Sequence, residues 1–154
     1  MDLFLIRHAH AEDGPPDHLR PLSARGRTQL KVLGEFLSRC GRFDPEEIWH
    51  SPLLRARETA ELIQRRVHPS VPLREAEHLT PADDPRLLAR RLANLPRRVA
   101  VVGHEPHLSA LASLLVTGAS EPPRFAMKKA AVLALEGGGS QWIVRWHVWP
   151  DLLA

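Results

Sequence analysis

Residues 99–102 read Val-Ala-Val-Val, an unbroken apolar run that constrains the fold more than any other segment of the chain. A strand with one face in water alternates apolar and polar residues, whereas a continuous β-branched run is typical of a strand covered on both faces. Residues 3–6, Leu-Phe-Leu-Ile, form a second apolar run of this length. Strands covered on both faces require helices on both sides of a sheet, so the two runs predict an α/β fold.

Short apolar segments and amphipathic segments alternate along the rest of the chain. We expect further strands at residues 48–49 and 71–73, and a pair at residues 131–135 and 142–148 around the turn Gly137-Gly138-Gly139. The spacing of apolar residues predicts helices from Ser23 to about Cys40, from Ser51-Pro52 to about Val67, from Pro85 to about Leu95, and from Pro106 to Val116. In the second helix, Ser51 is expected as the N-cap and Pro52 as the first helical residue. The alternation predicts a three-layer α/β/α sandwich, a mostly parallel sheet with an antiparallel edge.

Length and composition limit the classes of protein to which the chain can belong. A chain of 154 residues suits one domain with one core, and we expect residues 1–154 to form that domain. No segment resembles a secretory signal, and no apolar run approaches the roughly 20 residues of a membrane-spanning helix. Cys40 is the single cysteine, so a reducing, cytoplasmic location is expected. Aromatic residues make up only 5% and basic runs are no longer than pairs, which argues against nucleic acid as a partner.

Three short polar motifs each follow an expected strand. Arg7-His8 follows residues 3–6, the segment from Ser51 to Arg55 follows residues 48–50, and Gly103-His104-Glu105-Pro106 follows residues 99–102. In open α/β sheets, ligands bind at the carboxyl ends of the strands. The three motifs are therefore expected to meet at one site although they are far apart in sequence.

The assembled site would contain two arginines and two histidines, a set suited to phosphate chemistry. Arg7 and Arg55 can bind phosphoryl oxygens through planar guanidinium forks, and Arg55 would lie near a helix N-terminus, which favours an anion. Cations around His8 disfavour its protonated form, and a neutral imidazole is a competent nucleophile. His104 could bind a phosphoryl oxygen and, when protonated, would stabilise charge in the transition state.

Other phosphatase chemistries find no support in the sequence. Cys40 is not followed by an arginine six positions later, where Glu46 stands, and the chain contains no Asp-x-Asp pair. No stretch matches a P-loop. Because zinc needs a third or fourth ligand, we expect no metal at two histidine pairs, His8 with His10 and His104 with His107.

Four segments resemble, in order and at similar spacing, the motifs of the histidine phosphatase superfamily, which has a phosphoglycerate mutase-like fold. The segments are Arg7-His8-Ala9-His10-Ala11-Glu12, Pro21-Leu22-Ser23-Ala24-Arg25-Gly26, the ten residues from Ser51 to Ala60, and Val102-Gly103-His104-Glu105-Pro106. The first segment is most similar to that of the small SixA-type phosphohistidine phosphatases, which often carry alanine where most relatives carry glycine. Together the segments cover most of the chain from residue 2 to about residue 117.

The resemblance implies a catalytic role for specific residues. It implies that His8 accepts the phosphoryl group in a covalent intermediate, that Arg7, Arg55 and His104 complete the phosphate pocket, and that no metal or organic cofactor takes part. Larger relatives carry long insertions that build a cap, whereas the segment between Arg55 and Val99 is short here. A shallow site is expected, which suits phosphohistidine on a protein such as a histidine-containing phosphotransfer domain.

The proton donor and the substrate remain open at this point. Larger relatives place a carboxylate after the third strand, where Glu77, His78 and Asp83 are the candidates, and we favour Glu77. The alternatives to a protein phosphohistidine phosphatase are a small-molecule phosphomonoesterase, a phosphoglycerate mutase-like transferase and a non-catalytic phosphate-binding module. Retention of both histidines and both arginines argues against the last alternative.

Overall fold

The two apolar runs form adjacent strands in the middle of the sheet. The computed structural model describes residues 1–154, with β1 (Asp2–Arg7) and β4 (Val99–Gly103) paired in parallel, so that Leu3 lies beside Val99 and Arg7 beside Gly103. Every residue of β4 is buried. Alternate residues of β1 contact opposite faces of the sheet, since Leu3 and Leu5 belong to one apolar core and Phe4 and Ile6 to the other. The expected burial on both faces is confirmed.

The sheet has six strands in the order β3-β2-β4-β1-β5-β6. β2 (Glu47–His50) pairs in parallel with β4 and with β3 (Leu73–Glu75), whereas β5 (Val132–Gly138) is antiparallel to β1 and to β6 (Gln141–Val148). The prediction of a mostly parallel sheet with an antiparallel edge is therefore confirmed.

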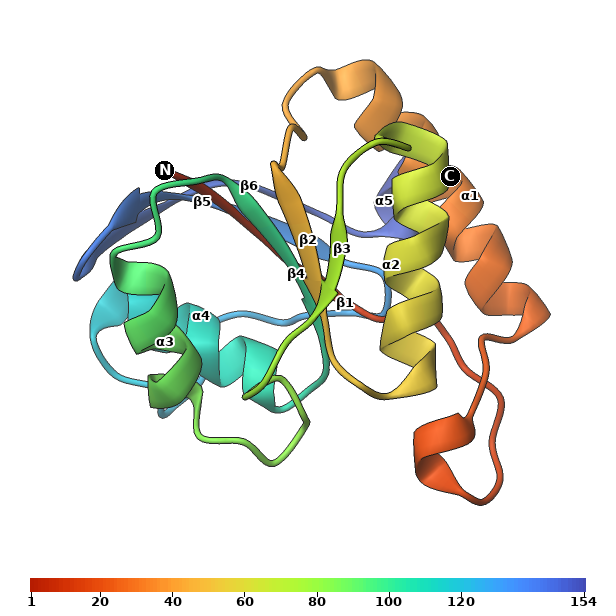
Figure 1. Ribbon diagram of the computed structural model, residues 1–154, viewed down its shortest axis with the longest axis horizontal. Coiled ribbons are helices and arrows are strands. Elements are labelled where there is room, and N and C mark those ends of the chain that lie inside the picture. Colours follow the sequence, from red (N-terminus) through yellow and green to blue (C-terminus); the bar gives the residue numbers. More distant parts are fainter.

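Helices cover both faces of this sheet, as Figure 1 shows. One face carries α1 (Ala24–Cys40), α2 (Leu54–Val67) and the short C-terminal α5 (Pro150–Leu153), and the other carries α3 (Pro85–Ala93) and α4 (His107–Thr117). A short 3₁₀ helix, η1 (Asp17–Leu19), lies in the loop between β1 and α1. None of the helices has both the length and the apolar character needed to cross a membrane.

Three element boundaries differ from the sequence prediction. β3 occupies residues 73–75 and not 71–73. β5 continues through Gly137 and Gly138, because Gly137 N donates to Met1 O and the N-terminal amine donates to Gly137 O, each at 3.0 Å. α2 begins at Leu54, so the assignment of Ser51 as its N-cap and Pro52 as its first residue is wrong.

The start of α1 fixes the loop that follows His8. Ser23 caps the helix as predicted, with its Oγ accepting a hydrogen bond from Gly26 N at 3.0 Å. A Cβ added to Gly26 would lie 2.0 Å from the backbone carbonyl oxygen of His10. Only glycine allows this close approach, so Gly26 sets the distance between α1 and the segment just after β1.

We predict that Gly26→Ala lowers the free energy of unfolding by about 1–3 kcal/mol, because the added methyl group forces backbone to move in a close-packed region. The measurement is urea denaturation followed by circular dichroism. Gly34→Ala in the same helix is the matched control, since its Cβ would meet only the flexible side chain of Arg66. Equal stability of Gly26→Ala and the control would contradict the packing argument.

Candidate active site

The carboxyl ends of β1, β2 and β4 bring the three polar motifs together at one edge of the sheet, the lower edge in Figure 1. His8 N donates to Gly103 O at 3.0 Å, and Ser51 N donates to Val102 O at 3.1 Å. The imidazole rings of His8 and His104 have centroids 5.1 Å apart. The structure therefore confirms the prediction that the three motifs meet at one edge of the sheet.

His8 presents an unprotonated ring nitrogen. Its Nδ1 lies 2.7 Å from Ala9 O, and a carbonyl oxygen can only accept, so Nδ1 carries the proton and Nε2 keeps a free lone pair. The loop is held in turn by Thr59, whose Oγ1 accepts from Ala9 N at 3.1 Å and donates to Arg55 O at 2.7 Å. The direction of the nucleophilic lone pair is thus set by backbone and by a buried threonine.

Burial lowers the pKa of His8 most strongly, the hydrogen bond to Ala9 opposes this, and the nearby cations of Arg55, Arg7 and Lys129 lower it as well; together these effects place the pKa at about 4. The side chain is only 6% exposed. At neutral pH the ring is uncharged, which is the state required of a nucleophile.

His104 is oriented by Ser51. Ser51 Oγ accepts a hydrogen bond from Leu53 N at 3.1 Å and lies 2.7 Å from His104 Nε2. Because Ser51 Oγ already accepts from Leu53 N, we assign its hydroxyl as the donor to His104 Nε2. In a neutral imidazole the other nitrogen, Nδ1, then carries the proton. Burial, His8 and Arg55 lower the pKa of His104 to about 3, so this ring is also neutral. It therefore acts as a neutral donor in the free protein, not as the cation that the sequence allowed.

The two arginines are anchored through their Nη atoms and not through Nε. Arg7 Nη1 donates to Met127 O at 2.9 Å, and Arg55 Nη1 donates to the backbone carbonyl of Asp17 at 3.0 Å. The Nε of each guanidinium group is buried without a hydrogen-bond partner. Both arginines thus keep a free donor beside the histidine pair.

Unpaired buried donors mark the pocket as an anion site. Six buried side-chain nitrogens in the protein lack a partner, and three belong to this pocket: Arg7 Nε, Arg55 Nε and His104 Nδ1. Buried polar groups are almost always hydrogen-bonded, so such a concentration requires an explanation. An anion with several acceptor oxygens would satisfy all three, and a phosphoryl group has this form.

Asp17 is a pocket residue that the sequence analysis missed, as is the Ser51 hydroxyl. Asp17 Oδ2 accepts a hydrogen bond from Arg55 Nη2 at 3.4 Å, and Asp17 Oδ1 accepts one from Arg20 Nε at 3.1 Å. Burial opposes ionisation, but Arg55 and Arg20 together keep the pKa of Asp17 below its ordinary value. Residues 7–22 carry no apolar pattern, so only the presence of an acidic residue in a loop leading from the site could have indicated this contact.

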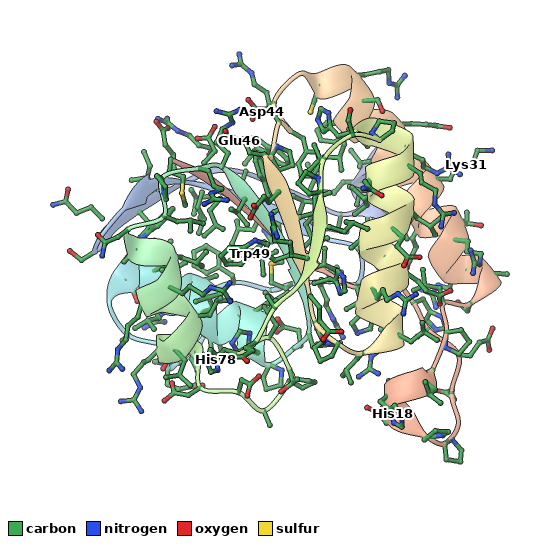
Figure 2. All side chains as sticks on the ribbon, viewed as in Figure 1. His18, Lys31, Asp44, Glu46, Trp49 and His78 are labelled. Atoms are coloured by element: carbon green, nitrogen blue, oxygen red, sulfur yellow. The ribbon has the colours of Figure 1, made fainter.

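The candidate proton donors follow β3 and make no hydrogen bond or ion pair with His8 or His104. Glu77 is 89% exposed in its side chain, and its closest ionic partner is His78 Nε2 at 3.9 Å. Asp83 accepts hydrogen bonds from Thr80 N at 2.8 Å and Thr80 Oγ1 at 2.7 Å. Figure 2 shows His78 at the same edge of the molecule as the pocket, whereas His18 lies on the separate lobe formed by η1. The role of Glu77 stays a prediction.

The histidine pairs considered for metal binding do not form a ligand cluster. No group of three or more His, Cys, Asp or Glu side chains is arranged to hold a metal ion. His10 Nδ1 is instead 2.6 Å from Ser23 Oγ, at the start of α1. His107 is buried beneath the site with neither ring nitrogen hydrogen-bonded.

Known proteins share both the sequence and the fold. The model of the histidine phosphatase superfamily (branch 1) matches residues 3–82. An uncharacterized protein of Picosynechococcus sp. is 32% identical, over 92% of this chain and 88% of that protein. Phosphohistidine phosphatase SixA of Escherichia coli (strain K12) is 28% identical, over 91% of this chain and 89% of its own length.

Solved structures match over nearly the whole chain. The protein histidine phosphatase SixA complexed with tungstate aligns with a TM-score of 0.89 and 25% identity, covering 100% of both chains. The alpha-ribazole phosphatase from Shigella flexneri aligns with a TM-score of 0.73 and 18% identity, covering 94% of this chain and 95% of that one, a likeness of fold alone. The chain therefore belongs to the histidine phosphatase superfamily (branch 1), resembles SixA within it, and is a metal-independent phosphatase.

Proposed function

We propose that the protein is a phosphohistidine phosphatase that removes the phosphoryl group from a phosphorylated protein and carries it transiently on His8. The observation that supports this most directly is the set of three buried, unpaired donors, Arg7 Nε, Arg55 Nε and His104 Nδ1, beside a histidine with a free Nε2 lone pair. These donors match phosphoryl oxygens, and the lone pair matches attack on phosphorus.

In the first step, His8 Nε2 forms a bond to phosphorus while the bond from phosphorus to the substrate nitrogen breaks. Arg7 and Arg55 donate hydrogen bonds to phosphoryl oxygens, and His104 Nδ1 donates a further hydrogen bond to an oxygen of the same phosphoryl group. The leaving imidazole takes a proton, for which we propose Glu77 as the donor, with His78 and Asp83 as the alternatives. Water then attacks the phosphoryl group on His8, which releases inorganic phosphate and restores the free ring.

A protein substrate is favoured because few elements surround the pocket, which leaves room for a protein surface to approach it. Between the end of α2 and the start of β4 the chain forms only β3 and α3, so residues 1–154 are proposed to act as one domain without a cap insertion. The similarity to SixA, named for phosphohistidine, supports the same substrate class. A histidine-containing phosphotransfer domain in the cytoplasm is the partner we propose.

A small phosphomonoester is the second candidate substrate. The same fold occurs in an alpha-ribazole phosphatase, whose name describes a small-molecule substrate. The phosphoryl pocket itself contacts only the transferred group, so it accepts either class. Phosphoglycerate mutase activity is a further alternative. It requires the phosphoryl group on His8 to be transferred to a hydroxyl group of the substrate and not to water.

We predict a higher kcat/KM for a phosphohistidine protein than for p-nitrophenyl phosphate, a phosphosugar or 3-phosphoglycerate. All four are compared by release of inorganic phosphate, in the presence of EDTA. Turnover in EDTA is expected to be unchanged, because the proposed chemistry uses only side chains. Preferred turnover of a phosphomonoester, isomerisation of 3-phosphoglycerate without phosphate release, or a strict need for metal would each overturn part of the proposal.

We predict that His8→Ala abolishes turnover, because no other ring nitrogen occupies the nucleophile position. In the unmodified protein, ³²P-labelled substrate followed by rapid denaturation at alkaline pH, where phosphoramidates survive, is expected to leave label on His8. Peptide mapping locates the label. His10→Ala, which removes the neighbouring ring, serves as the control and is expected to retain labelling at His8. Label that persists in His8→Ala would assign the nucleophile elsewhere.

We predict that the His8 ring titrates near pH 4, well below the ordinary pKa of 6.5, because burial and the surrounding cations disfavour its charged form. Acidification through the 6.5-to-4 window is therefore expected to destabilise the fold, since the unfolded chain takes up this proton first. The measurement is an NMR titration of the ring nitrogens. Arg7→Ala removes a nearby cation and is expected to raise the midpoint. A midpoint at 6.5 or above in the unmodified protein would contradict the electrostatic analysis.

A further inference from the structure

A second positively charged hollow lies directly beside the phosphoryl pocket. It has a volume of about 420 Å³, and four cationic side chains line it, namely Arg7, Arg25, Lys128 and Lys129. Asp151 is the one carboxylate in its wall. We call this hollow the basic groove.

The cations of the basic groove have no direct ion-pair partner within the protein, although the charge of Glu105 acts on Arg7. None of the four takes part in an ion pair, although thirteen ion pairs occur elsewhere in the chain. Burial and the nearby guanidinium groups of Arg7, Arg20 and Arg25 lower the pKa of Lys129, against a smaller opposing effect of Asp13. Like charges crowded in one concave surface attract anions, because each added negative charge relieves their mutual repulsion.

The basic groove is continuous with the catalytic pocket. Arg7 lines the groove and also belongs to the proposed phosphate pocket beside His8. Lys129 is close enough to His8 for its charge to lower the pKa of that ring. A molecule whose phosphoryl group reaches His8 therefore has its neighbouring atoms over the groove.

The form of the groove indicates what kind of anion it takes. Lys128 and Arg25 are exposed and make no side-chain hydrogen bond, unlike Arg55, which is buried and held in a fixed direction. Trp149, whose ring lies 5.6 Å from Lys128 Nζ, adds an apolar wall. Exposed cations without hydrogen-bond partners, spread beside an aromatic ring, match dispersed carboxylates on a protein surface better than one compact phosphate group, which is bound best by donors that converge on a point.

We propose that the basic groove docks an acidic protein surface, with Asp and Glu side chains next to the phosphorylated histidine, and so selects the substrate. This inference rests on the proposed phosphohistidine phosphatase function. The groove contributes affinity and orientation for the protein part of the substrate, while Arg55, His104 and His8 act on the phosphoryl group alone.

The test compares two synthetic phosphohistidine peptides that differ only in the residues flanking the histidine, Glu in one and Gln in the other. At low ionic strength, kcat/KM is expected to be about tenfold higher for the Glu peptide, and added salt is expected to remove the difference. Lys128→Glu and Arg25→Glu are each expected to abolish the preference, mainly through KM. Lys31→Glu is the matched control with the preference retained, because Lys31 is an exposed residue of α1 (labelled in Figure 2) that does not line the groove.

Binding of the unphosphorylated Glu peptide, followed by fluorescence anisotropy, separates this inference from the proposed function. If neither phosphopeptide is hydrolysed, the proposed function fails, and the groove is still tested by whether Lys128→Glu weakens peptide binding. Equal kcat/KM for the two peptides, or a preference that survives both charge reversals, would overturn the docking role. Strong selection for a small bisphosphate over the Glu peptide would assign the groove to a second phosphate and overturn it as well.

Discussion

The parallel pairing of β1, β4 and β2 is the constraint on which the rest of the site depends. Because all three strands run in the same direction, their carboxyl ends coincide, and the first residues beyond them are joined by backbone hydrogen bonds, His8 N to Gly103 O and Ser51 N to Val102 O. These bonds place the rings of His8 and His104 next to each other, with centroids 5.1 Å apart and planes tilted by 53°. Burial of β4 on both faces makes this register costly to change.

The pocket contains buried positive charges and unpaired donors, which are unfavourable without an anion and favourable with one. Arg7 and Arg55 bring two cations to a buried site, and each keeps an unpaired Nε. Burial, assisted by the same cations, lowers the pKa of His8, so one arrangement would both attract a phosphoryl group and leave the proposed nucleophile unprotonated. A site built only for stability would pair these groups internally, as Glu47 does elsewhere by accepting hydrogen bonds from Trp49, Arg74 and Arg97. Unsatisfied donors are therefore better explained by function than by folding.

Much of this arrangement could be predicted from the sequence, and the exceptions have a common cause. The apolar runs identify β1 and β4, and the polar residues after them identify His8 and His104, because strand direction alone brings these together. The role of Ser51 was mistaken: a serine before a proline is a typical helix start, yet its hydroxyl contacts His104 and α2 begins later. Asp17 reaches Arg55 across a loop, a contact that no periodic pattern records. Side-chain contacts between distant segments were the part that local patterns could not supply.

Substrate selection has to come from outside the phosphoryl pocket. In the proposed mechanism, Arg7, Arg55, His8 and His104 contact a group that is identical in phosphohistidine, phosphomonoesters and phosphosugars, so they would not distinguish these molecules. The fold adds no cap above them, since β3 and α3 are the only elements between α2 and β4. The remaining contacts available to a bound substrate are on the rim, where the loop of Asp17 contacts Arg55 and the basic groove includes Arg7. In this protein, the rim is therefore where a substitution would change the substrate preference while the groups of the phosphoryl pocket stay the same.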